Sequence, residues 1–241
     1  MPKFAGAEDF RHDSQTRIGV VLVNLGTPDD KTSSAVRRYL DEFLSDPRVV
    51  EFPRIPWWLI MNLFILRFRP PRVAKAYASV WQPGGSPLLV HSKNQAAALQ
   101  KELDKHFPER FHVALAMRYG NPAIADVLEE LRQQHCRHLL VIPMFPQYSA
   151  TTTASIFDEV TRVMQSWRML PQMRMPLHYH DHPEYIEALA ASVENSWKEH
   201  VRGELLLMSF HGLPQRYLHA GDPYFCECMK TARLLADRLG L

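Results

Sequence analysis

His211 is the residue of this chain whose setting most strongly suggests chemistry. It comes after Glu204-Leu-Leu-Leu-Met208, a nearly unbroken apolar run that predicts a short buried strand, and Gly212 and Pro214 end that strand at once. Open α/β sheets bind their ligands at the carboxyl ends of strands. An imidazole titrates near neutrality and also binds transition metals, so we expect His211 to act as a base or as a metal ligand. The alternative interpretation is a strand-end histidine satisfied by local hydrogen bonds.

Other polar side chains follow the ends of predicted strands. Arg118 and Tyr119 follow one strand, Tyr148 follows another, and Ser86 lies on a Gly-Gly-Ser-Pro turn. Because the carboxyl ends of parallel strands share one edge of a sheet, these residues are candidates for lining a binding cleft. A guanidinium group binds carboxylates in a bidentate manner, and a tyrosine ring stacks on apolar surfaces. An arginine that only caps a neighbouring helix is the alternative for Arg118.

Strand and helix patterns alternate along the chain, which is typical of an α/β fold with a parallel sheet. The predicted strands cover 18–25, 111–117, 138–144, about 175–179 and the run before His211. The predicted helices cover 32–44, 73–80, 91–106, 124–131, 156–167, 183–200 and a final segment ending near Gly240. The pattern predicts a Rossmann-like layered sheet. The turn at 25–30 has one glycine and neither phosphate-binding spacing, so no nucleotide cofactor is expected.

The composition is that of an ordinary globular protein, with 241 residues, 46% hydrophobic residues and a net charge of +2. The small charge gives no reason to expect nucleic acid as a partner. Residues 1–16 are polar and predict a loose N-terminal tail, not a signal peptide. The three cysteines, Cys136, Cys226 and Cys228, suit a reducing cytoplasm, and they supply no four-cysteine set for an iron–sulfur cluster.

The most apolar window is Ile55–Phe68. It is shorter than the about 20 residues that a membrane-spanning helix needs. It is apolar all round, and composition alone therefore favours burial in a core. The alternative is an exposed lip that faces a flat apolar ligand or a bilayer surface, with Arg54, Arg67, Arg69 and Arg72 around it.

Three histidines alternate at positions 178, 180 and 182, and on a strand they would share one face. However, Asp181-His182-Pro183 is more typical of a helix start, which removes His182 from that face. The sequence therefore disfavours a metal site here.

Six segments, in order along the chain, resemble conserved blocks of one enzyme family, the ferrochelatases, which insert ferrous iron into protoporphyrin to make haem. The sixth block is the His211 segment with Gly221-Asp-Pro-Tyr224. The other five are Leu22-Val-Asn-Leu-Gly-Thr-Pro28, Phe43-Leu-Ser-Asp-Pro-Arg-Val-Val50, Gly84-Gly-Ser-Pro87, Met117-Arg-Tyr-Gly120 and Pro146-Gln-Tyr-Ser149.

The resemblance implies two similar Rossmann-like lobes with a cleft between them, of which the second is incomplete in this chain. The pattern of strands and helices begins a second α/β unit near 169–173, so the chain is predicted to consist of a tail at 1–16, a first lobe at 17–168 and a partial second lobe at 169–241. The resemblance also implies that the apolar segment, at about 52–70, is the lip over a porphyrin pocket. Its apolar side chains and flanking arginines make the same lip a candidate for peripheral membrane contact.

For the site, the resemblance implies that His211 is the catalytic residue and a ligand of the iron, with protoporphyrin IX and ferrous iron as substrates. Arg118, Tyr119, Tyr148 and Ser86 are then porphyrin contacts. The family's acidic partner of the histidine matches no residue here, so the 241-residue chain is expected to be inactive alone. A tetrapyrrole-binding fragment without catalysis, and a cobalt or nickel chelatase for another tetrapyrrole, are the alternatives.

Overall fold

The structure is a computed structural model that describes residues 4–6, 12–13 and 16–241. The chain divides into two compact units. The first unit extends to Met144 and adds Thr151–Pro176, and the second comprises Phe145–Ala150 and Leu177–Leu241.

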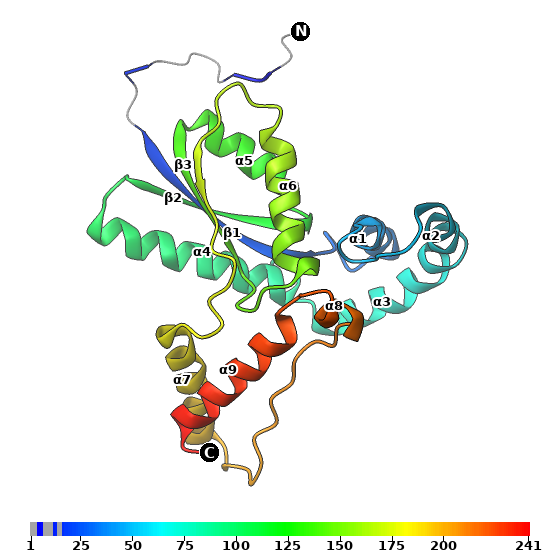
Figure 1. Ribbon diagram of the computed structural model, residues 1–241, viewed down its shortest axis with the longest axis vertical. Coiled ribbons are helices and arrows are strands. Elements are labelled where there is room, and N and C mark those ends of the chain that lie inside the picture. Colours follow the sequence, from blue (N-terminus) through cyan, green and yellow to red (C-terminus); the bar gives the residue numbers. More distant parts are fainter. Residues whose placement is uncertain (1–3, 7–11, 14–15) are drawn as a thin grey trace. The chain divides into compact units, whose positions relative to one another are not determined.

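The first unit is built on a parallel four-stranded sheet with the strand order β2-β1-β3-β4 (Figure 1). The strands are β1 (Arg17–Thr27), β2 (Phe111–Gly120), β3 (Cys136–Pro143) and β4 (Gln172–Arg174). Central β1 places Val21 opposite Ala114 of β2 and Val141 of β3. Its apolar run is buried because helices cover both faces of the sheet, as is usual for parallel strands. The first three predicted strands are confirmed.

The helical segments of this unit include those that cover the sheet and those of the apolar segment. They are α1 (Ser33–Ser45), α2 (Arg54–Ile60), the π-helical turn η1 (Met61–Ile65), α3 (Leu66–Val80), α4 (Pro87–His106), α5 (Ile124–Gln133), the π-helical turn η2 (Ala150–Ala154) and α6 (Ser155–Met164). Helix α4 packs on one face of the sheet, and α5 with α6 packs on the other (Figure 1). The three-layer α/β prediction is therefore confirmed.

Caps explain where two helices begin. The Thr32 side chain accepts a hydrogen bond from the Ala35 backbone N–H at 3.4 Å and starts α1. Ser86 accepts one from the Leu89 N–H at 3.2 Å, and Pro87 occupies the first helical position of α4. For this reason α4 begins at Pro87 and not at the predicted His91.

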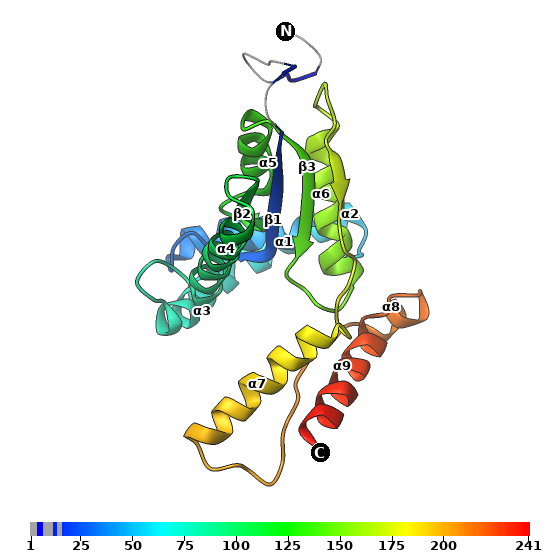
Figure 2. The ribbon, with the colours of Figure 1, turned by 90° about the vertical axis from the view of Figure 1, so that its left-hand side faces the viewer.

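The second unit contains α7 (Pro183–Glu199), α8 (Gln215–His219) and α9 (Tyr224–Leu239). Helices α7 and α9 lie side by side (Figure 2), and Arg238 of α9 forms ion pairs with Glu187 and Glu194 of α7.

The predicted strand before His211 is wrong. Residues 201–214 have no regular secondary structure, and Leu205 and Leu207 are 83% and 82% exposed. Helices are the only regular elements that the structure describes within Leu177–Leu241, so the apolar run has no strand with which to form a ladder. A strand without a neighbouring strand leaves its backbone N–H and C=O groups without hydrogen-bond partners and its side chains unburied, whatever its composition.

The strand predicted near 175–179 is also wrong. The extended residues are Gln172–Arg174, which pair with β3 and so extend the sheet of the first unit. Pro176 has no N–H with which to continue the ladder. The first unit ends at Pro176, and the second unit continues from Leu177.

The described part of the predicted loose tail is bound to the first unit. The Ala5 N–H donates to the Ser166 carbonyl at 2.8 Å, and the Arg168 N–H donates to the Ala5 carbonyl at 2.8 Å. Much of the predicted tail lies outside the described residues, but Ala5 is held by backbone pairing and is not loose at that point.

The carboxyl ends of β1 and β2 approach so closely that one position requires glycine. Gly26 has φ +115°, and an added Cβ would lie 1.8 Å from the Tyr119 carbonyl oxygen. We expect Gly26→Ala to lower the free energy of unfolding by at least about 3 kcal/mol, because it combines backbone strain with a backbone clash. Urea denaturation followed by circular dichroism measures the loss.

Gly212→Ala is the matched control, since no atom lies within 4 Å of a Cβ added there. Its expected effect is within about 0.5 kcal/mol. Equal stability of the two variants would contradict the close approach of β1 and β2.

Candidate functional site

A buried polar network lies at the carboxyl end of β2. The Asp46 Oδ2 atom accepts hydrogen bonds from Arg118 Nη2 at 2.7 Å, Tyr119 Oη at 2.7 Å and Ser155 Oγ at 2.6 Å. Arg118 Nε also donates to the Ser155 carbonyl at 3.0 Å. The network thus joins the end of β2, the residue after α1 and the start of α6 within the first unit.

The charges of this network are set by burial and by the partners of Asp46. Burial alone would raise the pKa of Asp46, but hydrogen bonds from Ser155, Tyr119 and the Arg48 backbone, together with the Arg118 charge, lower it below its usual value. Burial raises the pKa of Tyr119, so its hydroxyl stays protonated and donates. The Tyr119 ring packs edge-on against Phe43, with 5.1 Å between the ring centroids. The network is a fixed anchor for the strand end.

Two of the predicted porphyrin contacts, Arg118 and Tyr119, belong to this network, and a third, Ser86, has an internal partner elsewhere in the first unit. The Tyr119 side chain is completely buried, and Ser86 is 1% exposed and caps α4. The Arg118 guanidinium already has Asp46 as its carboxylate partner, and its Cζ lies 4.6 Å from the Tyr119 ring centroid. In the described structure these side chains position the strand end and the start of α4, and direct contact with a porphyrin stays a prediction.

His211 is exposed and borders a cavity of about 590 Å³ in the second unit. The cavity is lined mainly by apolar groups, among them Phe210, Leu213, Tyr224, Phe225 and Met229. Burial is the main reason that the pKa of Tyr224 rises to about 12, and a hydrogen bond from the His211 backbone acts in the opposite direction. The sequence-predicted base therefore lies beside an apolar cavity with its imidazole accessible to solvent.

Asp222 holds the loop of this unit that carries Tyr148. It accepts hydrogen bonds from Ser149 Oγ at 3.0 Å, the Ala150 N–H at 2.8 Å and the Tyr224 N–H at 3.0 Å. Tyr148 itself is half-buried, and its backbone N–H donates to Glu227 at 2.7 Å. The sequence predicted Asp222 only as a helix cap, whereas the structure shows that it also joins residues 149–150 to the start of α9.

The apolar segment of α2, η1 and α3 is largely exposed. Ile55, Trp58, Leu63, Phe64 and Phe68 are each more than half exposed. The other side of the segment is anchored: Met61 and Leu66 belong to a buried cluster with α1, and Trp57 Nε1 donates to the Leu44 carbonyl at 2.7 Å. Burial, which composition favoured, therefore applies to one side of the segment only, and the other side forms an exposed apolar lip.

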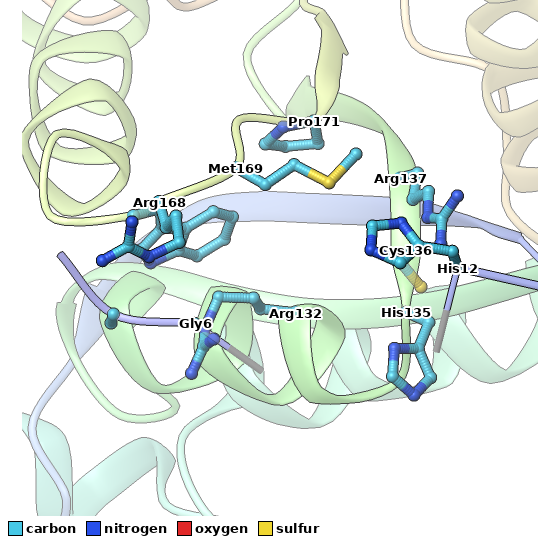
Figure 3. A pocket seen from close by; sticks show the side chains of 11 residues that line it. Gly6, His12, Arg132, His135, Cys136, Arg137, Arg168, Met169 and Pro171 are labelled. Atoms are coloured by element: carbon cyan, nitrogen blue, oxygen red, sulfur yellow. The ribbon is translucent and has the colours of Figure 1, made fainter. Parts of the chain in front are cut away.

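A basic cavity of about 350 Å³ lies where β3 begins, at the opposite end of the sheet from the Asp46 network. Figure 3 shows the side chains of Arg132, His135, Arg137 and Arg168 around it, with Cys136 and Met169 among them. Sequence reasoning missed this cavity, because its residues come from separate elements and form no local motif.

Among the described helices, none has a stretch of 18 residues apolar enough to cross a membrane.

Comparison of this sequence with known proteins identifies the family to which the chain belongs. A family model described as Ferrochelatase matches residues 17–241. The chain belongs to the ferrochelatase family. It is 56% identical over 238 residues to the ferrochelatase of Nitrosococcus oceani, 53% identical over 238 residues to that of Marinobacter nauticus, and 52% identical over 239 residues to that of Idiomarina loihiensis. Each match covers 99% of this chain but only 64%, 64% and 66% of the respective ferrochelatase.

Sequence reasoning did not assign a role to Asp46, although it quoted the ferrochelatase-like block Phe43-Leu-Ser-Asp-Pro-Arg-Val-Val50 that contains it. A buried carboxylate that pairs with an arginine is recognisable only when its partners are known, and those partners lie 72 and 109 residues away. The signal available in the sequence was a lone aspartate before proline, which more often marks a turn.

The network predicts a pH dependence of stability. Because the pKa of folded Asp46 lies below its usual value of 3.8, its stabilising contribution is complete above about pH 5 and is lost as the pH falls through the folded pKa. We expect Asp46→Asn to cost about 3 kcal/mol at pH 7, since Arg118 loses its buried partner. The wild type should then lose more stability than this variant between pH 5 and pH 2, roughly the span over which a salt-bridged aspartate titrates.

Asp158→Asn is the control, because Asp158 also pairs with an arginine but is 47% exposed. Its expected cost is about 0–1 kcal/mol. Parallel pH profiles for the wild type and Asp46→Asn in chemical denaturation would refute the ionised, stabilising role of Asp46.

Because much of the lip is exposed, we expect substitutions of its exposed residues to have little effect on the free energy of unfolding. Trp58→Ser and Phe64→Ser should each change the free energy of unfolding by less than about 1 kcal/mol, because their side chains are 63% and 60% exposed. Met61→Ala, in the same segment but 2% exposed, should cost about 2–5 kcal/mol. Melting curves of the three variants test this, and a similar loss in all three would show that the whole segment is core.

Proposed function

We propose that this chain carries the porphyrin-binding and histidine-bearing part of a ferrochelatase, which inserts ferrous iron into protoporphyrin IX to form protohaem. The observation that carries the proposal is the family match over residues 17–241, which includes the segment of His211 and Gly221–Tyr224. The exposed imidazole of His211 beside an apolar cavity of about 590 Å³ supports it.

The reaction makes defined chemical demands. The porphyrin gives up two pyrrole protons, and Fe²⁺ sheds water and takes four pyrrole nitrogens, so the products are haem and two protons. The ring must bend for its nitrogens to become accessible, and an apolar pocket that fits the bent ring lowers that barrier. The protons need an acceptor that titrates near neutrality, which is the ordinary range of histidine.

In this proposal His211 accepts a pyrrole proton or binds the incoming iron. Both roles require an accessible imidazole, which the exposed position of His211 provides. The exposed lip residues and Tyr148 contact the porphyrin face. Arg118, Tyr119 and Ser86 act as positioning residues, since burial and existing partners hold them in place.

The proposal also places the protein in the cytoplasm, with the lip as the point of peripheral contact with a membrane. Exposed Ile55, Trp58 and Phe64, with arginines in the same segment, support such a contact. An apolar surface beside cations suits the interface of an anionic bilayer.

Porphyrin binding without catalysis is the second candidate for these 241 residues. It is favoured by the irregular, exposed segment before His211, which leaves the histidine without a rigid strand beneath it. The catalytic and the binding proposals differ in whether metal is inserted. Assays of haem formation by the 241-residue chain and by a full-length fusion separate them.

The decisive experiment joins this chain to the remaining carboxyl-terminal part of the Nitrosococcus oceani ferrochelatase. Incubated anaerobically with ferrous iron and protoporphyrin IX, the fusion should produce the haem absorption spectrum. His211→Ala in the fusion should lower the rate by at least about 100-fold, because the base or ligand is removed. Porphyrin affinity, measured by fluorescence quenching, should stay within about threefold, since apolar contacts dominate such binding.

His219→Ala is the matched control, because His219 is exposed on α8 and does not line the His211 cavity. Turnover of His211→Ala within tenfold of the parent fusion would overturn its catalytic role. The 241-residue chain is assayed beside the fusion: porphyrin binding without haem formation supports the binding proposal for this length of chain. Insertion of cobalt or nickel but not iron would identify a different chelatase.

A further inference from the structure

The second unit contains a cluster of potential metal ligands that does not line the His211 cavity. Potential ligand atoms of His178, His180 and Glu227 all lie within 4.8 Å of one another. His178 Nδ1 lies 2.7 Å from Glu227 Oε1, and His180 Nδ1 lies 3.3 Å from Glu227 Oε2. The two imidazole rings are 5.3 Å apart between centroids.

Local structure explains why these three residues meet. His178 and His180 alternate on the segment that precedes α7, and Glu227 lies in the first turn of α9. His182 is turned to another partner, since it forms an ion pair with Glu184 at 2.7 Å as α7 begins. The alternating pattern therefore contributes two histidines and not three, and the third ligand comes from a distant helix. Sequence reasoning disfavoured this site because the pattern alone does not reveal Glu227.

The cluster is buried on one side and open on the other. The side chains of His180 and Glu227 are 7% and 8% exposed, whereas that of His178 is 54% exposed. The Tyr148 N–H donates to Glu227 Oε2 and holds the carboxylate in place. Within the described residues, His180 Nδ1 is buried and makes no hydrogen bond, although Glu227 lies close to it. A buried nitrogen without a hydrogen bond is costly, and a metal ion would satisfy its lone pair.

We propose that His178, His180 and Glu227 bind one divalent transition metal ion of the Zn²⁺, Co²⁺ and Fe²⁺ class. Two imidazoles and one carboxylate are a known ligand set for such ions, with metal–ligand distances of about 2.0–2.2 Å. The exposed side of His178 leaves a fourth position for water. Coordination through His178 Nδ1 requires the tautomer protonated at Nε2, and the metal then replaces the hydrogen bond between His178 and Glu227.

The site would have a structural consequence within the second unit. A metal ion there would join the segment before α7 to the first turn of α9. Because binding to the folded state alone stabilises it, saturating metal should raise the melting temperature of this unit.

The test is a titration of the 241-residue chain with Zn²⁺ by calorimetry and with Co²⁺ by visible absorption. Because His211 is a second candidate ligand, all proteins carry His211→Ala, which separates this proposal from the proposed catalytic function. We expect one equivalent of metal and a Co²⁺ spectrum typical of four or five ligands. His178→Ala should weaken binding at least about tenfold. Glu227→Gln, which keeps an acceptor for the Tyr148 N–H but loses the charge, should do the same.

His182→Ala is the matched control and should change the affinity by less than twofold. Melting curves without metal show whether each variant is folded, and the exposed position of His178 makes its variant the one least able to disturb the fold. Binding that survives His178→Ala and Glu227→Gln, or that His182→Ala abolishes, overturns the site. The absence of a Co²⁺ spectrum in the parent chain shows that the cluster is only a carboxylate–histidine hydrogen-bond network.

Discussion

The hydrogen bonds to the buried carboxylate of Asp46 are the interactions on which the carboxyl end of β2 depends. Three side-chain donors from β2 and α6 converge on one oxygen of this carboxylate, within 2.6–2.7 Å. A buried charge is tolerated only when it is paired and hydrogen-bonded, so removal of any partner exposes the others to the full cost of desolvation. The end of β2, which carries Arg118 and Tyr119, is therefore fixed before any ligand arrives. Rigidity of this kind lets a pocket favour a distorted ligand over a flat one.

The sequence was sufficient for those parts of the fold that local patterns determine. Three strands of the first unit follow from apolar runs, while the predicted start of α4 at His91 missed the cap and first turn formed by Ser86 and Pro87. It was insufficient where the outcome depends on partners. The run Glu204–Met208 has the composition of a buried strand, yet it is irregular because the described residues of its unit offer no strand beside it. Composition indicates which secondary structure a segment prefers, but a strand forms only where another strand can pair with it.

The same distinction applies to the candidate sites. His211 was singled out from its own neighbours in sequence, and the structure places it, exposed, beside a cavity, while its catalytic role stays a prediction. Asp46 and Glu227 were missed because their roles arise from contacts across many residues of chain. Tyr119 and Ser86 were predicted as porphyrin contacts from their strand-end and turn placement; the structure also gives them internal partners, and their contact with a porphyrin stays a prediction.

The segment before His211 is irregular, so the orientation of that histidine depends on the free-energy balance between an irregular and a strand conformation of Glu204–Met208. A strand that paired with Glu204–Met208 would bury Leu205 and Leu207, which are now almost fully exposed, and would gain about 3–6 kcal/mol from these two side chains. Against this stands about 1–2 kcal/mol of backbone entropy for each residue ordered. The two amounts are of similar size, so modest changes in the neighbouring polypeptide would shift the balance. The orientation of the imidazole is thus coupled to sheet formation by residues that never contact it.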